Sequence, residues 1–285
     1  LAVGMEMFQT PFQQVLDKFI DGQIDENSFL EQSEYFSRWR YDYNLYKQII
    51  DYIKLQKIPL IALNISGDIS RKVARQGIDG LADKKKRRLP SAMDFSNEKY
   101  RRDLDKVFTA HGEQKELKEF NYFYQAQVLW DEGMAESAYR FLANNPDRKL
   151  VVLAGNGHVR HKYGIPERLY RRNREPFTVI VQDDDIKEGI ADYVLLTTEL
   201  SGKKSPKLGV IVKEKDKNLM IMNVVNKSSA KKAGLQKGDI IQQFAGRSIV
   251  SLADLKLALF YTKTGDSLSI KIKRGDKTLD KKIDL

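Results

Sequence analysis

The fold of the longer part of this chain is indicated by the stretch Leu150-Val-Val-Leu-Ala-Gly-Asn-Gly-His-Val-Arg-His-Lys-Tyr-Gly-Ile-Pro166. Residues 150–154 form an unbroken apolar run, which is typical of a strand buried on both faces in a parallel sheet. Gly155 and Gly157 follow immediately and let the backbone turn sharply where the strand ends. Open α/β sheets bind their ligands at that end of the strands. The stretch therefore predicts a ligand-binding turn at the carboxyl edge of a parallel sheet.

This turn carries His158, and its chemistry leaves two interpretations open. An imidazole nitrogen can ligate a metal or carry a proton near neutral pH, and free amides at Gly155 and Gly157 can hold an anion. The alternative is a tight strand-to-helix turn in which the histidine only caps or packs. A single Gly-x-Gly-His sequence does not decide between a site and a structural turn.

Composition limits the class of protein. The 285 residues are enough for two domains, and 41% of them are hydrophobic, as in globular proteins with extensive cores. Lys and Arg total 49 against 39 Asp and Glu, and the net charge of +10 favours acidic partners. Because basic residues are interleaved with acids along the chain, we do not expect nucleic-acid binding. The chain has no cysteine, which excludes disulfides and thiolate sites, and no apolar run approaches the ~20 residues that cross a bilayer.

Strand and helix patterns alternate around the opening stretch. Apolar runs predict further strands at residues 1–5, 59–65, 177–181 and 191–196. Apolar positions at helical spacing predict helices at residues 11–20, 68–77, 97–108, 113–144 and 165–172. We therefore expect an α/β domain over residues 1–200, with a mainly parallel sheet flanked by helices.

Three polar residues outside the turn are candidate site residues. Glu6 follows the first predicted strand, where a carboxylate can act as a base or ligand or can cap the next helix. Gln127 and Asp131 lie four residues apart in the otherwise apolar stripe of the helix at 113–144. Buried polar groups need partners, so we expect both to face the polar turn or a ligand. A small rotation of the helix would instead place them at the edge of the stripe.

Two further features organise the rest of the chain. Residues 29–53 are dense in aromatics, which suits either the walls of a pocket for a flat ligand or an ordinary core. The polar segment Gly202-Lys-Lys-Ser-Pro206 is the best domain boundary. A smaller α+β domain over residues 205–285 is predicted by short strands at 208–212, 219–225, 239–244 and 267–272 and helices at 230–233 and 252–261.

The smaller domain resembles a PDZ domain of the bacterial type. The resemblance is carried by Ser229-Ala-Lys-Lys-Ala-Gly-Leu-Gln-Lys-Gly-Asp-Ile-Ile-Gln-Gln-Phe-Ala-Gly246. In that family a glycine-containing loop binds a peptide carboxylate, and the peptide adds as a strand beside a groove. Lys207-Leu-Gly-Val210 occupies that loop with a single glycine, so interdomain docking is an alternative to peptide binding. The resemblance implies a groove lined by Leu208, Gly209, Val210 and Leu255.

The larger domain resembles the ChaN-type haem-binding lipoprotein family of the Tiki and erythromycin-esterase-like superfamily. The shared segments are, in order, Gly4-Met-Glu-Met-Phe8, Trp39-Arg40 with Tyr43, Pro59-Leu-Ile-Ala-Leu-Asn64, Ala126-Gln-Val-Leu-Trp-Asp-Glu-Gly-Met-Ala135, and Ala154-Gly-Asn-Gly-His158 followed by Gly164-Ile-Pro166. The resemblance implies haem binding at the cell envelope, a link to iron acquisition, and homodimers that bring haems together. Family members begin with a strand ending in Gly-Glu-x-His, and this sequence starts after that point, so we expect the domain to lack that strand and its histidine.

Carried onto this sequence, the resemblance implies a haem site at the glycine turn. His158 matches the family's turn, and Tyr163 in the same loop is the other candidate iron ligand. Basic side chains that can pair with the haem propionates are Arg160, Lys162 and Arg168. The remaining residues expected beside the haem are Gly155, Gly157, Glu6, Gln127 and Asp131.

Two other functions stay open. The wider superfamily includes metal-dependent hydrolases, in which Glu6 and His158 would hold a metal or activate water. The missing second histidine argues against this alternative. The third hypothesis is an adaptor whose PDZ-like module recruits a protein partner while the larger domain is only structural.

Overall fold

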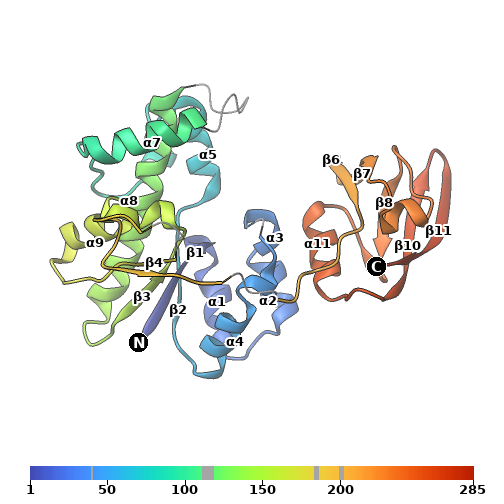
Figure 1. The fold of residues 1–285 in the computed structure, drawn as a ribbon, viewed down its shortest axis with the longest axis horizontal. Helices are drawn as coiled ribbons and strands as arrows, with labels where there is room; N and C mark the ends of the chain where they lie inside the picture. The colour runs from blue at the N-terminus through green and yellow to red at the C-terminus, as the bar shows by residue number, and fades with distance from the viewer. Residues whose placement is uncertain (40, 111–118, 183–185, 199–201) are drawn as a thin grey trace. The chain divides into compact units, whose positions relative to one another are not determined.

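The chain folds into two units, each assembled from two segments of sequence (Figure 1). The first unit comprises Leu1–Ile24 and Ile53–Glu199, and the second comprises Asp25–Tyr52 and Leu200–Leu285. This computed structural model describes residues 1–285 except 40, 111–118, 183–185 and 199–201, so Arg40 of the shared family segments lies outside the described residues. Residues 25–52 therefore belong with the carboxy-terminal part of the chain.

The first unit alternates strands with helices, as the periodicity predicts. Its strands are β1 (Ala2–Gln9), β2 (Leu60–Asn64), β3 (Leu150–Leu153), β4 (Ile180–Gln182) and β5 (Tyr193–Leu195). Its helices are α1 (Gln13–Ile20), α5 (Gly67–Gln76), α6 (Asp83–Lys86), α7 (Glu98–Ala110), α8 (Phe120–Asn144) and α9 (Ile165–Asn173). Short 3-10 turns are η1 (Thr10–Phe12), η3 (Asn156–His158) and η4 (Arg160–Lys162). The expected α/β class, a parallel sheet flanked by helices, is confirmed.

The main sheet of this unit has the strand order β2-β1-β3, and its strands run parallel. β1 lies in the middle, with Val3 opposite both Leu60 and Val151. Nearly all its side chains are buried, as expected for a central parallel strand. A Cβ added at Gly4 would lie 2.8 Å from a methyl carbon of Leu63, so glycine permits the close packing of β1 at this point.

Strand β3 is less buried than its apolar sequence predicts. It lies at an edge of the main sheet, and Val151 is 44% exposed. The order β3-α9-β4 normally places both strands in one sheet, but β4 pairs with β5 in a separate two-stranded parallel sheet. The expectation that residues 150–154 are buried on both faces is therefore wrong, because Leu150, Val152 and Ala154 pack against the core whereas Val151, on the other face, is exposed.

Helix α8 is the element against which most of the first unit packs. It contacts β2, α5, α7 and α9. Tyr124, Met134 and Ala138 of the predicted inward stripe are buried, and the charged residues Asp131 and Glu132 are buried with them. In the described part of the chain, no helix is long and apolar enough to cross a bilayer.

The first strand and helix begin and end differently from the prediction. β1 continues to Gln9, so Glu6 lies within the strand rather than after it. Thr10 and Pro11 form a separate 3-10 turn ahead of α1 instead of its first turn. Pairing between strands explains the extension, because Gln9 is held opposite Asn64 of β2.

The outer edge of β2 is closed by a side chain of α1. Gln13 accepts a hydrogen bond from the Ala62 amide at 2.7 Å and donates one to the Leu60 carbonyl at 2.8 Å. The side-chain amide thus takes the place of a neighbouring strand and protects an otherwise open edge.

The second unit is built on an antiparallel sheet with the order β11-β10-β8-β7-β6, and β9 pairs with β8. The strands are β6 (Val210–Lys215), β7 (Asn218–Val224), β8 (Ile240–Phe244), β9 (Arg247–Ser248), β10 (Ser267–Arg274) and β11 (Lys277–Asp284). The helices are α2 (Glu26–Gln32), α3 (Tyr35–Arg38), α10 (Ser229–Lys232) and α11 (Leu252–Phe260), with the 3-10 turn η2 (Tyr43–Leu45) and with α4 (Lys47–Leu55), which runs from this unit into the first. The predicted α+β class of the smaller domain is confirmed, but β9 and β11 were not predicted. The sequence of β11 is rich in charged residues and has no apolar pattern that predicts a strand. Its strand conformation is stabilised by antiparallel pairing with β10.

Replacing Gly133 by alanine should destabilise the first unit, although alanine is the better helix former. A Cβ at this position of α8 would lie 2.1 Å from Cγ2 of Ile65, which is too close for any side chain. We expect the free energy of unfolding to fall by about 2 kcal/mol in urea denaturation. The second substitution Ile65→Ala should recover part of this loss, and strictly additive losses would contradict the steric explanation.

Candidate functional site

His158 lies between two carboxylates at the carboxyl edge of the main sheet. Its Nδ1 is 2.7 Å from Oδ1 of Asp131, and its Nε2 is 3.4 Å from Oε1 of Glu6. The three side chains come from η3, α8 and β1, and none is more than 13% exposed. Glu6 also accepts a hydrogen bond from the Gly155 amide at 2.7 Å. The structure thus brings together four of the residues singled out from the sequence.

The two carboxylates keep His158 protonated. Burial opposes the charge, but the attraction and hydrogen bonds of Asp131 and Glu6 raise the pKa of the imidazole from 6.5 to about 10. Burial alone would raise the pKa of Glu6, yet His158 and the Gly155 amide lower it below its usual value. A protonated imidazole has no lone pair for a metal and cannot accept a proton. The geometry suits a buried cation that fixes the turn after β3.

Asp131 has a second donor that the sequence did not reveal. The hydroxyl of Tyr100, on α7, donates to Oδ2 of Asp131 at 2.5 Å. Asp131 is fully buried and Tyr100 is 4% exposed. Burial and the neighbouring charge of Asp131 raise the pKa of Tyr100 well above its usual value, so the phenol keeps its proton and continues to donate. In the sequence of α7, nothing distinguishes Tyr100 from an ordinary core aromatic.

Glu132, next to Asp131, binds three arginines of α9. Arg171 donates to both carboxylate oxygens at 2.7 and 2.9 Å, and Arg172 reaches one of them at 2.7 Å. The Nε atom of Arg168 is 3.3 Å from the same carboxylate, and Arg168 is only 3% exposed. These ion pairs fasten α9 to α8, so Arg168 is not available to the carboxylates of a ligand. The signal that could have revealed the cluster is the spacing of three arginines on one helix, beside two adjacent acids on another.

Tyr163 is placed differently from His158. Its ring stacks on that of His161, with 5.4 Å between centroids and 25° between planes, and lies 6.3 Å from the ring of Tyr100. The ring is partly buried against the aromatic cluster of α7 and α8, and within the described residues the hydroxyl has no hydrogen-bond partner. His161 is held through Nδ1, 3.2 Å from the Gly189 carbonyl. The phenol of Tyr163 and the imidazole of His161 thus lie side by side in one loop. The ion pairs of His158 anchor one end of this loop, and the ion pair of Arg168 anchors the other.

The glycines of this loop differ in what they contribute. A Cβ added at Gly157 would meet no atom within 4 Å, and neither Gly155 nor Gly157 has a positive φ. The positive φ angles fall at His161 and Lys162, at 53° and 66°. A Cβ at Gly164 would lie 2.2 Å from a backbone carbonyl oxygen. The sharp turn is therefore made later than predicted, and Gly164 is the glycine that it requires.

The other predicted site residues do not join the His158 network. Gln127 is half-buried, and its amide makes no hydrogen bond within the described part of the chain. Lys162 forms an ion pair with Asp192 at 2.5 Å, and Arg160 is partly buried in the same loop. Among the described residues, no group of three or more His, Asp and Glu side chains is arranged to hold a metal ion. Hydrolytic chemistry on His158 would require a neutral imidazole, which its raised pKa opposes.

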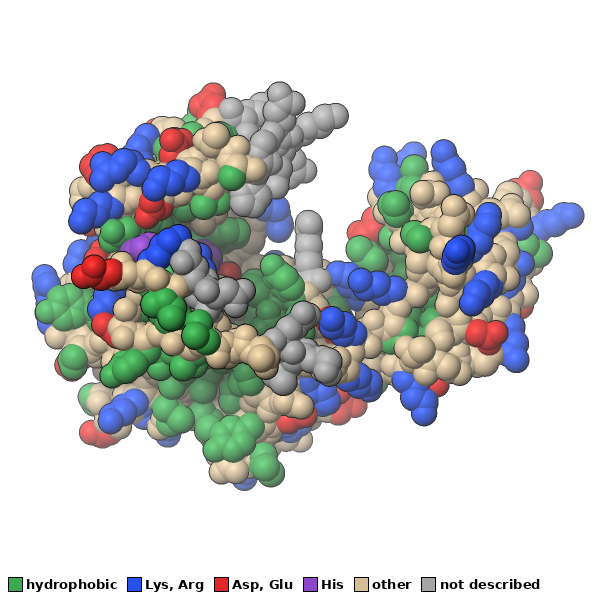
Figure 2. Space-filling model, in the orientation of Figure 1, with side chains coloured by type: hydrophobic (Ala, Val, Ile, Leu, Met, Phe, Trp, Pro, Cys, Tyr) green, Lys and Arg blue, Asp and Glu red, His purple; other side chains and the backbone are tan. Residues whose placement is uncertain are grey.

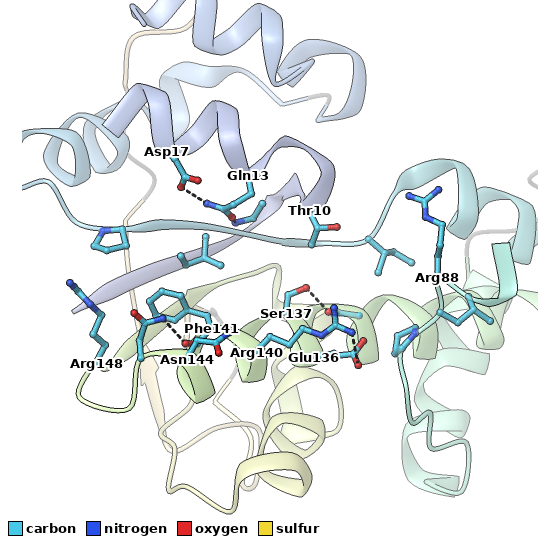
Figure 3. Close-up of a pocket in the computed structure, with 18 of the residues that line it drawn as sticks. Thr10, Gln13, Asp17, Arg88, Glu136, Ser137, Arg140, Phe141, Asn144 and Arg148 are labelled. Carbon is cyan, nitrogen blue, oxygen red and sulfur yellow. Dashed lines mark hydrogen bonds and ion pairs between the residues drawn. The ribbon is translucent and has the colours of Figure 1, made fainter. Parts of the chain in front are cut away.

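A cleft of about 760 Å³ runs along β2, between α1 and the last turns of α8 (Figure 3). Ile61 and Phe141 contribute apolar surface, and Arg88, Arg140 and Arg148 stand around it. The described residues that line the cleft include no His, Tyr, Met or Cys, the side chains that ligate haem iron. The cleft is therefore distinct from the loop that carries Tyr163.

Comparison with known proteins gives this arrangement a family. Residues 1–169 match the family described as haem-binding uptake, Tiki superfamily, ChaN, which is more than half of the chain. The chain belongs to the ChaN family. Residues 206–285 match the PDZ domain family, so both resemblances stated from the sequence are confirmed.

A solved ChaN structure has a similar fold. The protein of Campylobacter jejuni, described by its cofacial haem binding, matches with a TM-score of 0.51 and 20% identity over 68% of this chain and 72% of that chain. At this identity the likeness shows the fold alone.

Two curated relatives match shorter parts of this ChaN-family chain. A probable CtpA-like serine protease of Staphylococcus haemolyticus is 34% identical over 77 residues, which cover 27% of this chain and 16% of that protein. A probable periplasmic serine endoprotease, DegP-like, of Chlamydia trachomatis is 25% identical over 130 residues, which cover 46% of this chain and 24% of that protein. The chain thus spans less than a quarter of the length of either relative.

The PDZ domain of this ChaN-family chain presents β6 at the edge of its sheet. Gly209, just before β6, has a φ of +77°, and a Cβ there would lie 2.2 Å from Cβ of Ser228, so only glycine fits. Leu208 and Leu255 are each 2% exposed and belong to the core, against which Val210 also packs. Of the four residues expected at the groove, Leu208 and Leu255 therefore lie in the core, and among the described residues β6 pairs with β7 on one edge and with no strand on the other.

Replacing His158 by glutamine should destabilise the first unit most strongly in mildly acidic solution. The folded protein holds this proton to about pH 10, whereas the unfolded chain loses it near 6.5. The raised pKa therefore contributes its full stability below pH 6.5, and the contribution is lost as the pH rises to about 10. We expect a loss of about 3 kcal/mol near pH 6 in urea denaturation. The fluorescence of Trp130, whose ring lies 6.1 Å from that of His158, reports the transition.

The proteins with and without His158 both carry the substitution Trp39→Phe, so that the fluorescence comes from Trp130. The contribution of Glu6 has the opposite sense, because its lowered pKa stabilises the fold above the usual value and this stability is lost in acid. A difference between the proteins with and without His158 that stays constant from pH 6 to 10 would rule out the buried imidazolium.

Gly164→Ala should destabilise the loop, whereas Gly157→Ala should be tolerated. The first substitution forces a Cβ against a backbone carbonyl that cannot move without breaking the turn, and the second points into open space. We expect a loss of about 3 kcal/mol for Gly164→Ala and a change within about 0.5 kcal/mol for Gly157→Ala, from calorimetric melting. Equal losses would show that the turn depends on both glycines for backbone freedom rather than on Gly164 for space.

Proposed function

We propose that this protein binds haem through Tyr163, on the surface formed by the glycine turn and the aromatic residues of α7 and α8. The observation that carries the proposal is the difference in partners between the two candidate ligands. Both ring nitrogens of His158 are occupied by carboxylates, whereas the hydroxyl of Tyr163 has no partner among the described residues. A tyrosine oxygen is a known axial ligand of haem iron. Tyr163, and not His158, is therefore our choice for the ligand.

The surroundings of Tyr163 suit a flat, dianionic ligand. The partly exposed ring of His161, which stacks on Tyr163, provides aromatic surface beside it. Lys162 lies next to it, in an ion pair with Asp192 whose side chains are 36% and 32% exposed, so water or a propionate can compete for the ammonium group. Figure 2 shows histidine side chains reaching this face of the first unit, bordered by basic and hydrophobic side chains.

We infer further that the protein acts at the cell envelope in the uptake of haem or iron. The description of its family as haem-binding uptake supports this role, and the periplasmic description of the chlamydial relative supports the location. The cofacial haems named for the Campylobacter protein support a homodimer in which two copies face each other across their haems. In such a dimer the haem would be enclosed by two chains, which agrees with the surface position of the Tyr163 loop.

We propose that the PDZ domain binds the carboxyl-terminal segment of a partner protein beside β6. The open edge of β6 and the left-handed Gly209 before it support this role. The edge offers backbone groups for a further strand, and a glycine in that conformation turns loop amides toward one point. Docking of another part of this protein on the same edge is the alternative.

Haemin titrated into the full chain should produce a Soret band, and Tyr163→Phe should abolish or shift it. Phenylalanine keeps the packing of the ring but lacks the oxygen that binds iron, so the affinity should fall by a factor of roughly ten or more. Tyr193→Phe, at a tyrosine that is 63% exposed, is the matched control and should bind haemin like the unaltered protein. His158→Gln should retain the band. An identical spectrum for Tyr163→Phe would exclude this tyrosine as the ligand.

A further inference from the structure

Helix α11 of the second unit is buried on two opposite sides. Leu255, Ala258 and Leu259 face the core of the PDZ domain. Leu257 and Phe260 lie on the other side of the helix, outside that core, and are 6% and 4% exposed. A helix on the surface of a domain needs one apolar side, so a helix that is apolar on both sides is covered by a second element.

The cover comes from residues 25–45, far away in the sequence. Helix α3 contacts α11. The ring of Phe260 lies 6.3 Å from that of Phe36 and 5.3 Å from that of Tyr43, and the second pair meets edge to face at 80°. Tyr43 is fully buried and Phe36 is 8% exposed. We call Tyr35, Phe36 and Tyr43 the aromatic brace, since Tyr35 packs on both of the other rings at 5.1 and 5.2 Å.

The same segment holds the chain where it enters the PDZ domain. Asp42 accepts hydrogen bonds from the amide of Ser205 at 2.6 Å and from its hydroxyl at 3.0 Å. Asn44 donates to the Ser205 hydroxyl at 3.1 Å. Arg247 of β9 donates to Asn27 of α2 at 2.8 Å. Residues 25–45 therefore contact the domain at three places, one of them two residues before the loop that begins at Lys207.

The two ends of α11 are fixed by different partners. At its beginning, the Leu252 amide donates to the Glu214 carboxylate at 2.7 Å, which ties the helix to the end of β6. At its other end, Phe260 rests on the aromatic brace. The second half of α11 is thus held on one side by the PDZ core and on the other by residues that precede the PDZ domain by more than half of the chain.

We propose that residues 25–45 are a structural part of the peptide site of the PDZ domain, because they fix the width of the groove between β6 and α11. Helical periodicity places Leu252 and Lys256 between the core side of α11, which carries Leu255 and Leu259, and the braced side, which carries Phe260. The contact of the Leu252 amide with Glu214 turns this strip of the helix toward β6. Without the brace the second half of α11 can move away from β6, and a peptide strand loses one wall of its site. The inference rests on the proposed peptide binding at β6.

Amide hydrogen exchange of the full chain tests the brace directly. Phe36→Ala should speed exchange roughly tenfold or more in α11 and in residues 208–212, while the amides between β10 and β11 stay protected. Tyr41→Phe is the matched control, because Tyr41 lies in the same segment but is 59% exposed and outside the brace. It should leave exchange unchanged. Unaltered exchange of α11 in Phe36→Ala would overturn the proposal.

Two milder variants cover the case in which Phe36→Ala unfolds the whole unit. Phe36→Leu keeps most of the apolar contact, and Ser205→Ala removes only the hydroxyl contacts to Asp42 and Asn44. We expect graded exchange in α11 for the first and faster exchange in residues 207–212 for the second. If both variants exchange like the unaltered protein, the segment does not hold the groove.

A peptide experiment connects the brace with function. Random carboxyl-terminal peptides displayed on phage are selected on the unaltered full chain, and the best peptide is synthesised as the probe. Phe36→Ala should bind it roughly tenfold more weakly, Tyr41→Phe should bind it normally, and haemin binding should be the same in all three proteins. Equal peptide affinity would refute the role of the brace. If no peptide is selected, peptide binding at β6 is refuted instead, and hydrogen exchange alone decides whether residues 25–45 hold α11.

Discussion

The first unit depends on one buried positive charge. The imidazolium of His158 joins Glu6 of the central strand to Asp131 of the longest helix, and its charge offsets the cost of burying both carboxylates as ions. Glu132, the next residue of α8, makes a second buried cluster with the arginines of α9. Two adjacent acids therefore hold the turn after β3 and the helix that follows. Tyr163 lies in the sequence between the two clusters, so both determine where its hydroxyl stands.

Much of this architecture could be predicted from the sequence, because it follows from local patterns of apolar and polar residues. Apolar runs located the strands of the main sheet, and polar residues in apolar surroundings singled out Glu6, Asp131 and His158. The protonation state of His158 could not be predicted in the same way. Whether an imidazole is a neutral ligand or a buried cation depends on the distances to two carboxylates that lie far away along the chain. Tyr100 gave no sequence signal, since a tyrosine in a helix is usually part of a core.

In the second unit, too, a continuous sequence pattern predicts the fold, whereas contacts between segments far apart in the sequence could not be predicted. The PDZ signature is a continuous stretch, so its fold was evident before the structure. The aromatic residues at 29–53 could line a pocket or form a core, and the structure places Phe29, Tyr35, Phe36 and Tyr43 in a core. That this core includes the end of α11 could not be foreseen, because the apolar character of α11 does not say which segment covers its second side.

The discontinuous second unit also bears on how the protein withstands proteases. The chain passes between the units three times, after residues 24, 52 and 199. The exposed residues 202–204 are the natural place for a cut. A cut there would sever the covalent link to the PDZ domain, yet the severed fragment would still be held by side chains of residues 25–45, which stay joined to the haem-binding part at both ends. A nicked molecule would thus keep its PDZ domain as a non-covalent fragment, which a linker between two independent domains would not allow.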